Sequence, residues 1–187
     1  VMGFKANIRL MAWSDARRAL AAGRIDGLTG MFYSIERNRD YDFSVPHSTV
    51  QYSIFVRRHD DKGITSPDDL SGLEVLFQRG DIMEDWLNES GIQVTRIPVE
   101  APVDALRRLA SGENDCALLG RLPALFLLHH YNIENVVDIV DIHMAQDYCF
   151  AVVPGNDRLV QMLNEGLKTV KATGEYEKIA SRWFGVL

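Results

Sequence analysis

The sequence of 187 residues has no apolar run near the roughly eighteen residues that a membrane-spanning helix needs. It also has no basic patch, since 20 Lys and Arg residues are outnumbered by 26 Asp and Glu residues, and the formal net charge is −6. The basic side chains are scattered, so the chain has no electrostatic footprint for nucleic acid. Val1 is not followed by a signal-peptide pattern, and we therefore expect a mature fragment or an excised domain.

Cysteines and catalytic motifs are scarce. Cys116 and Cys149 each lie in an apolar, strand-like run, which favours buried free thiols and leaves a disulfide as the alternative. The pair His129 and His130 has no partner at metal-ligand spacing, which argues against a zinc site. Phosphate-binding glycine loops and a nucleophile elbow are missing as well. The sequence demands neither catalysis nor a metal, and we expect no cofactor.

Apolar residues make up 47% of the chain, which is enough for a full core in one domain or in two small lobes. An internal repeat favours two lobes. The segment DARRALAAGRID at 15–26 and the segment DALRRLASGEND at 104–115 are identical at seven of twelve positions. Both carry a glycine suited to end a helix and an Asp suited to begin a strand, which indicates two equivalent strand–helix–strand units.

Strands alternating with helices predict parallel sheets with right-handed crossovers. In the first unit we expect a strand at 5–12, a helix that Ser14 caps and Gly23 ends, and a strand at 25–31. The polar segment 59–72 is the expected connector, with a helix start at Ser66 and Pro67. The remaining expected strands are 50–57, 73–77, 92–97, 115–119, 136–140 and 148–153, and the remaining helices are 81–88, 103–110, 122–130, 156–174 and 175–183.

The stretch 30–44 is the first candidate for binding chemistry. It places Phe32, Tyr33, Ser34 and Arg37 directly after a probable buried strand. Loops held between strands often carry binding residues, and the planar guanidinium of Arg37 suits a carboxylate. A solvated or surface-paired arginine is the plainer alternative.

Three further positions lie where an expected strand meets a helix. The turn Gln78–Asp81 presents a helix N-terminus, whose N–H groups suit an anion, unless Asp81 caps the helix and uses those donors itself. Trp13 lies beside the expected crevice, with a place in the core as the alternative. Gly120 ends a strand at the same crevice, and Arg121 after it either approaches an anion or starts a helix at the surface.

Several motifs recur in a fixed order along the whole chain. They are W-x-x-A-x-x-x-L-x-x-G-R-I-D, F-Y-S-x-E-R-x-x-x-Y-D-F-S-x-P, D-L-x-G-L-x-V, R-G-D, D-C-A-L-L-G and L-N-E-G-L-x-x-V-K-A-T-G-E-Y-E-K-I-A-x-x-W-F-G. In this order they resemble bacterial extracellular solute-binding proteins of the polar-amino-acid type. The last two motifs look most like the Venus-flytrap sensor domains of bacterial receptors such as histidine kinases and diguanylate cyclases.

The resemblance implies a two-lobe α/β fold of the periplasmic-binding-protein type II class. Each lobe would be a doubly wound, mainly parallel sheet, with hinge strands near 51–57 and 147–153, and the lobes would close on a ligand. Lobe 1 would comprise residues 1–53 and 152–187, and lobe 2 residues 54–151. Such proteins normally begin with one more strand and helix, which this sequence does not include.

The resemblance also implies roles for individual residues. Arg37 would hold the ligand α-carboxylate, and Trp13 would stack on the ligand side chain. Backbone groups of 30–32 and 80–82 would complete the carboxylate site. The full set of expected ligand-binding residues is Trp13, Gly30, Met31, Phe32, Tyr33, Arg37, Gln78, Gly80, Asp81, Ile82 and Gly120.

Two departures from the family pattern bear on the ligand. Amino-acid binders usually place an acidic residue for the ligand ammonium five positions after the Asp that ends the second repeat. That position is Gly120 here, and Asp81 is the candidate substitute. The loop before Arg37 is also one residue shorter than in typical amino-acid binders, which affects the roles of Phe32 and Tyr33.

We therefore expect a module on the periplasmic or extracellular side of the bacterial inner membrane that binds a small carboxylate or amino acid and is not itself an enzyme. The resemblance favours the sensor domain of a transmembrane signalling protein, tethered to a membrane span, and allows a dimer. Three alternatives remain open: the soluble binding protein of an ABC importer, a periplasmic dehydratase acting on cyclohexadienyl carboxylates, and the effector-binding half of a cytoplasmic transcription regulator. The last would carry a helix-turn-helix upstream.

Overall fold

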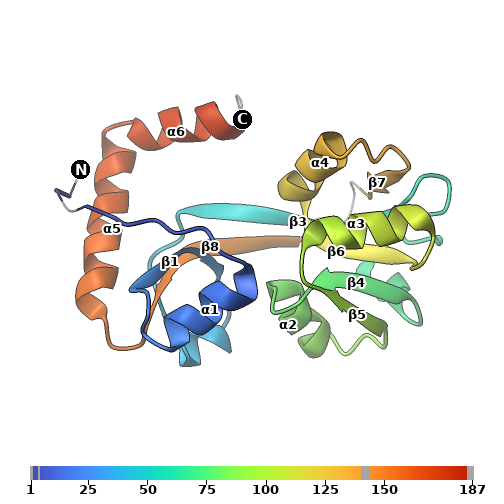
Figure 1. Cartoon of the computed structure of the whole chain (residues 1–187), viewed down its shortest axis with the longest axis horizontal. Helices are drawn as coiled ribbons and strands as arrows, with labels where there is room; N and C mark the ends of the chain where they lie inside the picture. Colours follow the sequence, from blue (N-terminus) through green and yellow to red (C-terminus); the bar gives the residue numbers. More distant parts are fainter. Residues whose placement is uncertain (1, 4, 140–143, 185–187) are drawn as a thin grey trace. The chain divides into compact units, whose positions relative to one another are not determined.

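The computed structural model describes residues 2–3, 5–139 and 144–184 of the chain (Figure 1). The chain divides into two compact units. Unit 1 is Val1–Ser48 together with Asp147–Leu187, and unit 2 is Thr49–Gln146. The chain passes between them at the start of strand β3 (Ser48–Arg57) and within strand β8 (Met144–Val152). Among the described residues, no helix is both long and apolar enough to span a membrane.

Unit 2 has the alternation that the sequence predicts. Strand β4 pairs in parallel with β5 and with β6, while β3 pairs antiparallel with β6 and with β7. Helix α3 packs against β4, β5 and β6 (Figure 1). The further elements of unit 2 are η2 (Pro67–Leu70), β4 (Glu74–Gln78), α2 (Ile82–Glu89), β5 (Thr95–Val99), α3 (Pro102–Ser111), β6 (Cys116–Gly120), α4 (Arg121–His130) and β7 (Val136–Asp138).

The core of unit 2 explains why these elements form. Strand β4 is a continuous apolar run at its centre, which suits a parallel strand covered on both faces. Helix α3 presents Ala105, Leu106 and Leu109 at helical spacing, and all three are fully buried against the sheet. Gly112 ends this helix at φ +88°, a conformation that favours glycine.

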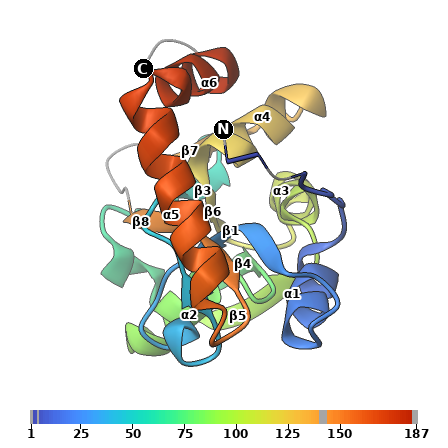
Figure 2. The ribbon, with the colours of Figure 1, turned by 90° about the vertical axis from the view of Figure 1, so that its left-hand side faces the viewer.

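Unit 1 is built around β8. Strands β1 and β2 both pair antiparallel with it, and helix α1 packs on β1 through Ala16 and Leu20. The long helix α5 ends before Gly174, after which α6 turns away from it (Figure 2). The elements of unit 1 are α1 (Trp13–Ala21), β1 (Gly27–Phe32), η1 (Arg37–Arg39), β2 (Asp42–Phe43), β8, α5 (Asp157–Ala172) and α6 (Glu175–Phe184).

The strand expected at 5–12 is wrong. These residues have no regular secondary structure, and Ile8 and Leu10 are 70% and 98% exposed. A strand needs a neighbour for its N–H and C=O groups, and no described strand pairs with this segment. The helix after it begins at Trp13 with Ala12 as its N-cap, so Ser14 lies inside the helix and does not cap it.

The α/β fold is confirmed, but parallel pairing is restricted to unit 2. In unit 1 every described ladder is antiparallel, because β8 returns beside β1 and the expected strand at 5–12 does not form. The predicted helix start at Ser66 is confirmed by a capping box with Asp69. Residue 140, in the expected strand 136–140, lies outside the described residues, and β7 ends at Asp138.

The two cysteines are free and buried, as first expected, and no disulfide joins them. Burial raises the pKa of the Cys116 thiol to about 12 and that of Cys149 to about 11. Both side chains are therefore neutral thiols at neutral pH, and they contribute to the core as small apolar groups.

Candidate functional site

The expected binding residues fall into two sets, one in each unit. In unit 1 the set is Trp13, Gly30, Met31, Phe32, Tyr33 and Arg37, and in unit 2 it is Gln78, Gly80, Asp81, Ile82 and Gly120.

Arg37 begins the short helix η1 and is only 4% exposed. Its backbone N–H donates to Ser34 Oγ at 3.1 Å, and its carbonyl accepts the N–H groups of Asp40 and Tyr41, each at 3.0 Å. A charged side chain is seldom this buried without a specific use, whereas Arg39 in the same helix is exposed. The alternative of a solvated Arg37 is therefore wrong, and its guanidinium is held on a fixed backbone.

The end of β1 presents backbone more than side chains. Met31 is fully buried in the core of unit 1, so its side chain is not available to a ligand. Phe32 is buried as well, while Tyr33 is exposed and meets the ring of Phe43 edge-on, with 5.4 Å between centroids. Tyr33 is thus the side chain in this segment that is open to solvent.

The ring of Tyr148 lies against the backbone of Gly30. A Cβ atom placed on Gly30 would come within 2.2 Å of Tyr148 Cε1, so no side chain fits there while the ring stays. The ring is flanked by Phe32, with 4.6 Å between centroids, and by His47, with 5.4 Å. Tyr148 therefore fixes the β1 segment from which the predicted binding backbone comes.

His47 supports the same segment. Its Nε2 lies 3.1 Å from the carbonyl oxygen of Thr29, and its Nδ1 lies 3.1 Å from Ser48 Oγ. Burial lowers the pKa of His47 and the charge of Lys171 adds to this, while the bond to Thr29 acts in the opposite direction. A neutral ring satisfies both contacts, with Nε2–H donating and Nδ1 accepting. Tyr148 and His47 were not predicted from the sequence, since only their position in the fold distinguishes them.

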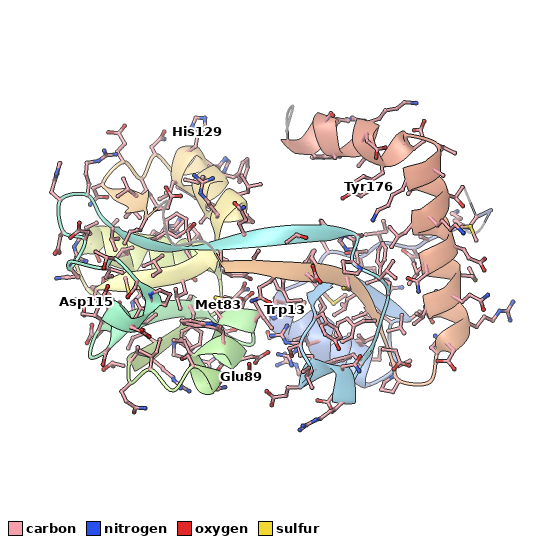
Figure 3. The ribbon with its side chains drawn as sticks, turned by 180° about the vertical axis from the view of Figure 1, so that it is seen from behind. Trp13, Met83, Glu89, Asp115, His129 and Tyr176 are labelled. Atoms are coloured by element: carbon pink, nitrogen blue, oxygen red, sulfur yellow. The ribbon has the colours of Figure 1, made fainter. Side chains whose placement is uncertain are left out.

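Trp13 is the first residue of α1 and is labelled in Figure 3. It is half-buried, packs on the core cluster that includes Leu20, and lies 5.9 Å from the Arg17 guanidinium. Part of the indole therefore packs in the core, and its role toward a ligand stays a prediction.

In unit 2, Asp81 is the N-cap of α2. Its Oδ1 accepts the Met83 N–H at 3.1 Å, and its Oδ2 accepts the Tyr52 hydroxyl at 2.8 Å. One residue earlier, Gly80 takes φ +70° and its N–H donates to Glu84 Oε2 at 2.6 Å. Two carboxylates of the protein thus use donors of this turn, and the cap interpretation of Asp81 is correct. Asp81 and Glu84 bring two carboxylates to this turn, while Arg79 within it forms an ion pair with Glu100.

Gln78 and Ile82 of this set, and Arg121 beside it, make contacts that serve the structure of unit 2. Gln78 Nε2 donates to the carbonyl of Glu100 at 3.2 Å, and the side chain of Ile82 is buried. Arg121 Nε forms an ion pair with Asp138 at 2.6 Å, which favours its structural interpretation over an anion-binding one. Tyr52 was not predicted from the sequence, because it lies on β3 while Asp81, which it holds, caps α2 29 positions further along the chain.

Gly120 is not required by space. It takes φ −56°, which any residue adopts, and a Cβ there would lie 3.7 Å from its nearest neighbour, Pro123. A methyl group at this position is therefore sterically acceptable. Neither the backbone angle nor the space for a Cβ therefore explains why this position is glycine and not an acidic residue.

Replacing Asp81 with alanine is expected to lower the free energy of unfolding by about 1–2 kcal/mol, because α2 loses its cap and the buried Tyr52 hydroxyl loses an acceptor. Tyr52→Phe removes the hydroxyl and keeps the cap, so its loss should be about 1 kcal/mol. Urea unfolding of the two single variants and the double variant measures this. The double variant should lose less than the sum of the single losses. Additive losses would show that the two side chains do not act together.

Comparisons with known proteins match this arrangement. The family described as "Bacterial extracellular solute-binding proteins, family 3" matches residues 1–186. The L-cystine-binding protein TcyJ of Escherichia coli (strain K12) is 25% identical over 185 residues, which are 98% of this chain and 69% of that protein. A crystal structure of the substrate-binding protein of an amino acid ABC transporter has a TM-score of 0.82 and 26% identity, over 99% of this chain and 82% of that one.

A second solved structure is more similar. It is a histidine kinase sensor domain with similarity to periplasmic binding proteins, with a TM-score of 0.92 and 36% identity, over 100% of this chain and 81% of that chain. The family resemblance and the two-lobe α/β class expected from the sequence are therefore confirmed. The chain belongs to the bacterial extracellular solute-binding proteins, family 3.

Proposed function

We propose that this chain is the extracytoplasmic ligand-binding domain of a transmembrane signalling protein, and that its ligand is an amino acid or another small carboxylate. The observation that carries the sensor role is the 36% identity to a histidine kinase sensor domain over 100% of this chain, against 26% for an ABC-transporter binding protein. A tether to the membrane is part of the proposal.

Arg37 is the proposed anchor for the ligand carboxylate. The guanidinium carries several donors in a fixed fork, which matches the two oxygens of a carboxylate. Its burial in unit 1 strengthens such a bond, because the local dielectric is lower than in water. Trp13, with its half-buried indole, offers a flat surface for the ligand side chain.

The acidic turn of unit 2 is the proposed contact for a cationic group. Asp81 holds its carboxylate at the N-terminus of α2 through bonds from the Tyr52 hydroxyl and the Met83 N–H, and a carboxylate attracts an ammonium group. Glu84 adds a second carboxylate at the same turn. The carboxylates of this turn favour an amino acid, which carries an ammonium group, over a dicarboxylate.

Signalling by such a domain needs differential affinity. A ligand shifts a conformational equilibrium only as far as it binds one state more tightly than the other. In this proposal the ligand contributes that difference by binding one state of the domain more tightly than the other. The domain itself performs no chemistry.

A thermal-shift screen with amino acids, dicarboxylates and aromatic acids tests the ligand class. A ligand at a hundred times its Kd adds about 2.7 kcal/mol, which corresponds to a rise in Tm of about 5–10 °C for a domain of this size. We expect amino acids to give the largest rise. If no small carboxylate or amino acid raises the Tm, the proposed ligand class is wrong.

A transport role is the second candidate, favoured by the similarity to an amino acid ABC-transporter binding protein. The gene sequence after the codon for Leu187 distinguishes the sensor role from the transport role. A membrane-spanning segment shortly after the codon for Leu187 supports the sensor, and a stop codon there supports transport. A turnover assay on the compounds that bind distinguishes both from a dehydratase-type enzyme, which would convert its ligand and would need a general acid in its site.

A further inference from the structure

Three consecutive residues of unit 1, Val45–His47, are each hydrogen-bonded to a side chain of α5 or α6. Asn164 Oδ1 accepts the N–H of the first residue at 2.8 Å, Lys171 Nζ lies 3.4 Å from the carbonyl oxygen of the second, and the Tyr176 hydroxyl donates to the carbonyl of the third at 2.5 Å. Asn164 and Lys171 come from α5, and Tyr176 from the first turn of α6 (Figure 3). Side chains of the two C-terminal helices thus hold the backbone of residues 45–47 through hydrogen bonds.

Residues 45–47 lie directly before the point where the chain passes from unit 1 to unit 2. The next residue, Ser48, is the last of the first segment of unit 1 and the first of strand β3, which continues into unit 2. The backbone N–H of His47 also donates to the carbonyl of Tyr148 at 3.0 Å, and Tyr148 follows the point where β8 enters unit 1. Residues 45–47 therefore lie next to both places where the chain passes between the units.

Helix α6 depends strongly on these contacts. None of its side chains at 175–183 is buried, and Ile179 and Trp183 are largely exposed. Tyr176 is half-buried and bonded, and Lys171 Nζ lies 5.3 Å from the centroid of its ring. An element with few buried side chains lies at the low end of local stability, so one bonded tyrosine has a large influence on its position.

We propose that Asn164, Lys171 and Tyr176 form a clamp that couples α6 to the two strands by which the chain passes between its units. The clamp transmits a change of the 45–48 backbone to α6, and a change of α6 to that backbone. It rests on the proposed function only for its trigger, because ligand binding would be the event that moves the strands. The coupling itself is a property of unit 1 and can be measured without ligand.

Hydrogen–deuterium exchange of the whole chain without ligand is the first test. Tyr176→Phe removes one hydroxyl and leaves the ring, so we expect amides of 44–50 to exchange about fivefold faster, as the loss of one hydrogen bond predicts. Lys171→Met should act on the same amides. Lys168→Met, one turn earlier on α5, is the matched control, and peptides from α3 are the internal reference. The clamp is refuted if 44–50 is unchanged in both clamp variants, or if Lys168→Met has the same effect.

The second test uses the amino acid that gives the largest rise in Tm in the thermal-shift screen. In the wild type it should change the exchange of α6. In Tyr176→Phe its affinity should stay within about threefold, since the hydroxyl is placed in the clamp and not in the ligand site, but the response of α6 should be lost. A response of wild-type size in Tyr176→Phe would overturn the clamp. Failure of every compound to bind the wild type counts against the proposed function alone, and the ligand-free test then decides the clamp.

Discussion

Replacing Arg37 with methionine is expected to weaken ligand binding at least about a hundredfold. The guanidinium can form two charge-assisted hydrogen bonds to a carboxylate, each worth about 1.5–3 kcal/mol, and methionine retains the apolar volume but none of the donors. The burial of Arg37 makes the loss larger than it would be at the surface, because water cannot take over the role of the donors. Isothermal titration with the ligand found by thermal shift measures the change.

Two matched variants make the result interpretable. Arg39→Met alters the exposed arginine of the same short helix and should leave the affinity within about threefold. Arg37→Lys keeps the positive charge but loses the fork, so its affinity should lie between those of the wild type and Arg37→Met. Unfolding curves of all three establish that the fold is intact. Equal affinities for Arg37→Met and Arg39→Met in folded protein would exclude Arg37 as the carboxylate anchor.

Replacing Gly30 with alanine is expected to lower the free energy of unfolding by about 2–3 kcal/mol, because overpacking of this kind forces a rigid side chain to move. The new methyl carbon would lie 2.2 Å from Tyr148 Cε1 and 2.5 Å from its hydroxyl oxygen. The ring cannot simply swing aside, since Phe32 and His47 pack on it. Urea unfolding measures the loss.

Gly120→Ala is the control for this variant. It has the same chemical change, but the nearest atom is 3.7 Å from the new carbon, so the free energy of unfolding should change by less than about 0.5 kcal/mol. In the background Tyr148→Ala, the substitution Gly30→Ala should lose most of its effect, because the clashing ring is gone. If Gly30→Ala is as stable as Gly120→Ala, the ring of Tyr148 does not fix this segment.

Unit 2 was predictable because local and tertiary preferences agree there. Its strands β4 and β6 are buried along their centres and read as continuous apolar runs, helix α3 carries apolar residues at helical spacing, and Gly112 marks the end of that helix. The segment 5–12 failed for the opposite reason. Its apolar residues resemble those of a strand, but a strand exists only with a neighbour, and the sequence does not say whether one is present.

In the candidate site, too, residues that belong to local sequence patterns were predicted and residues that act over long sequence distances were not. Arg37 and Asp81 were identified because each belongs to a local pattern, a loop after a strand and a helix cap. Tyr52 and Tyr148 were missed because they act across the sheet, on residues that are distant in the chain. Tyr52 holds a carboxylate 29 positions away, and Tyr148 lies over a glycine of another strand. Such pairs depend on strand order, which the sequence alone did not reveal.

The free space beside Gly120 affects how easily this position can change its side chain. Glycine codons become Asp or Glu codons by a single base change, and the backbone at Gly120 is ordinary for any residue with free space for a Cβ. A carboxylate side chain is therefore one base change away, at a position where neither the backbone angle nor the space for a Cβ stands against it. In the evolution of this protein, a negative charge at the start of α4 is thus a short step that selection can take in either direction.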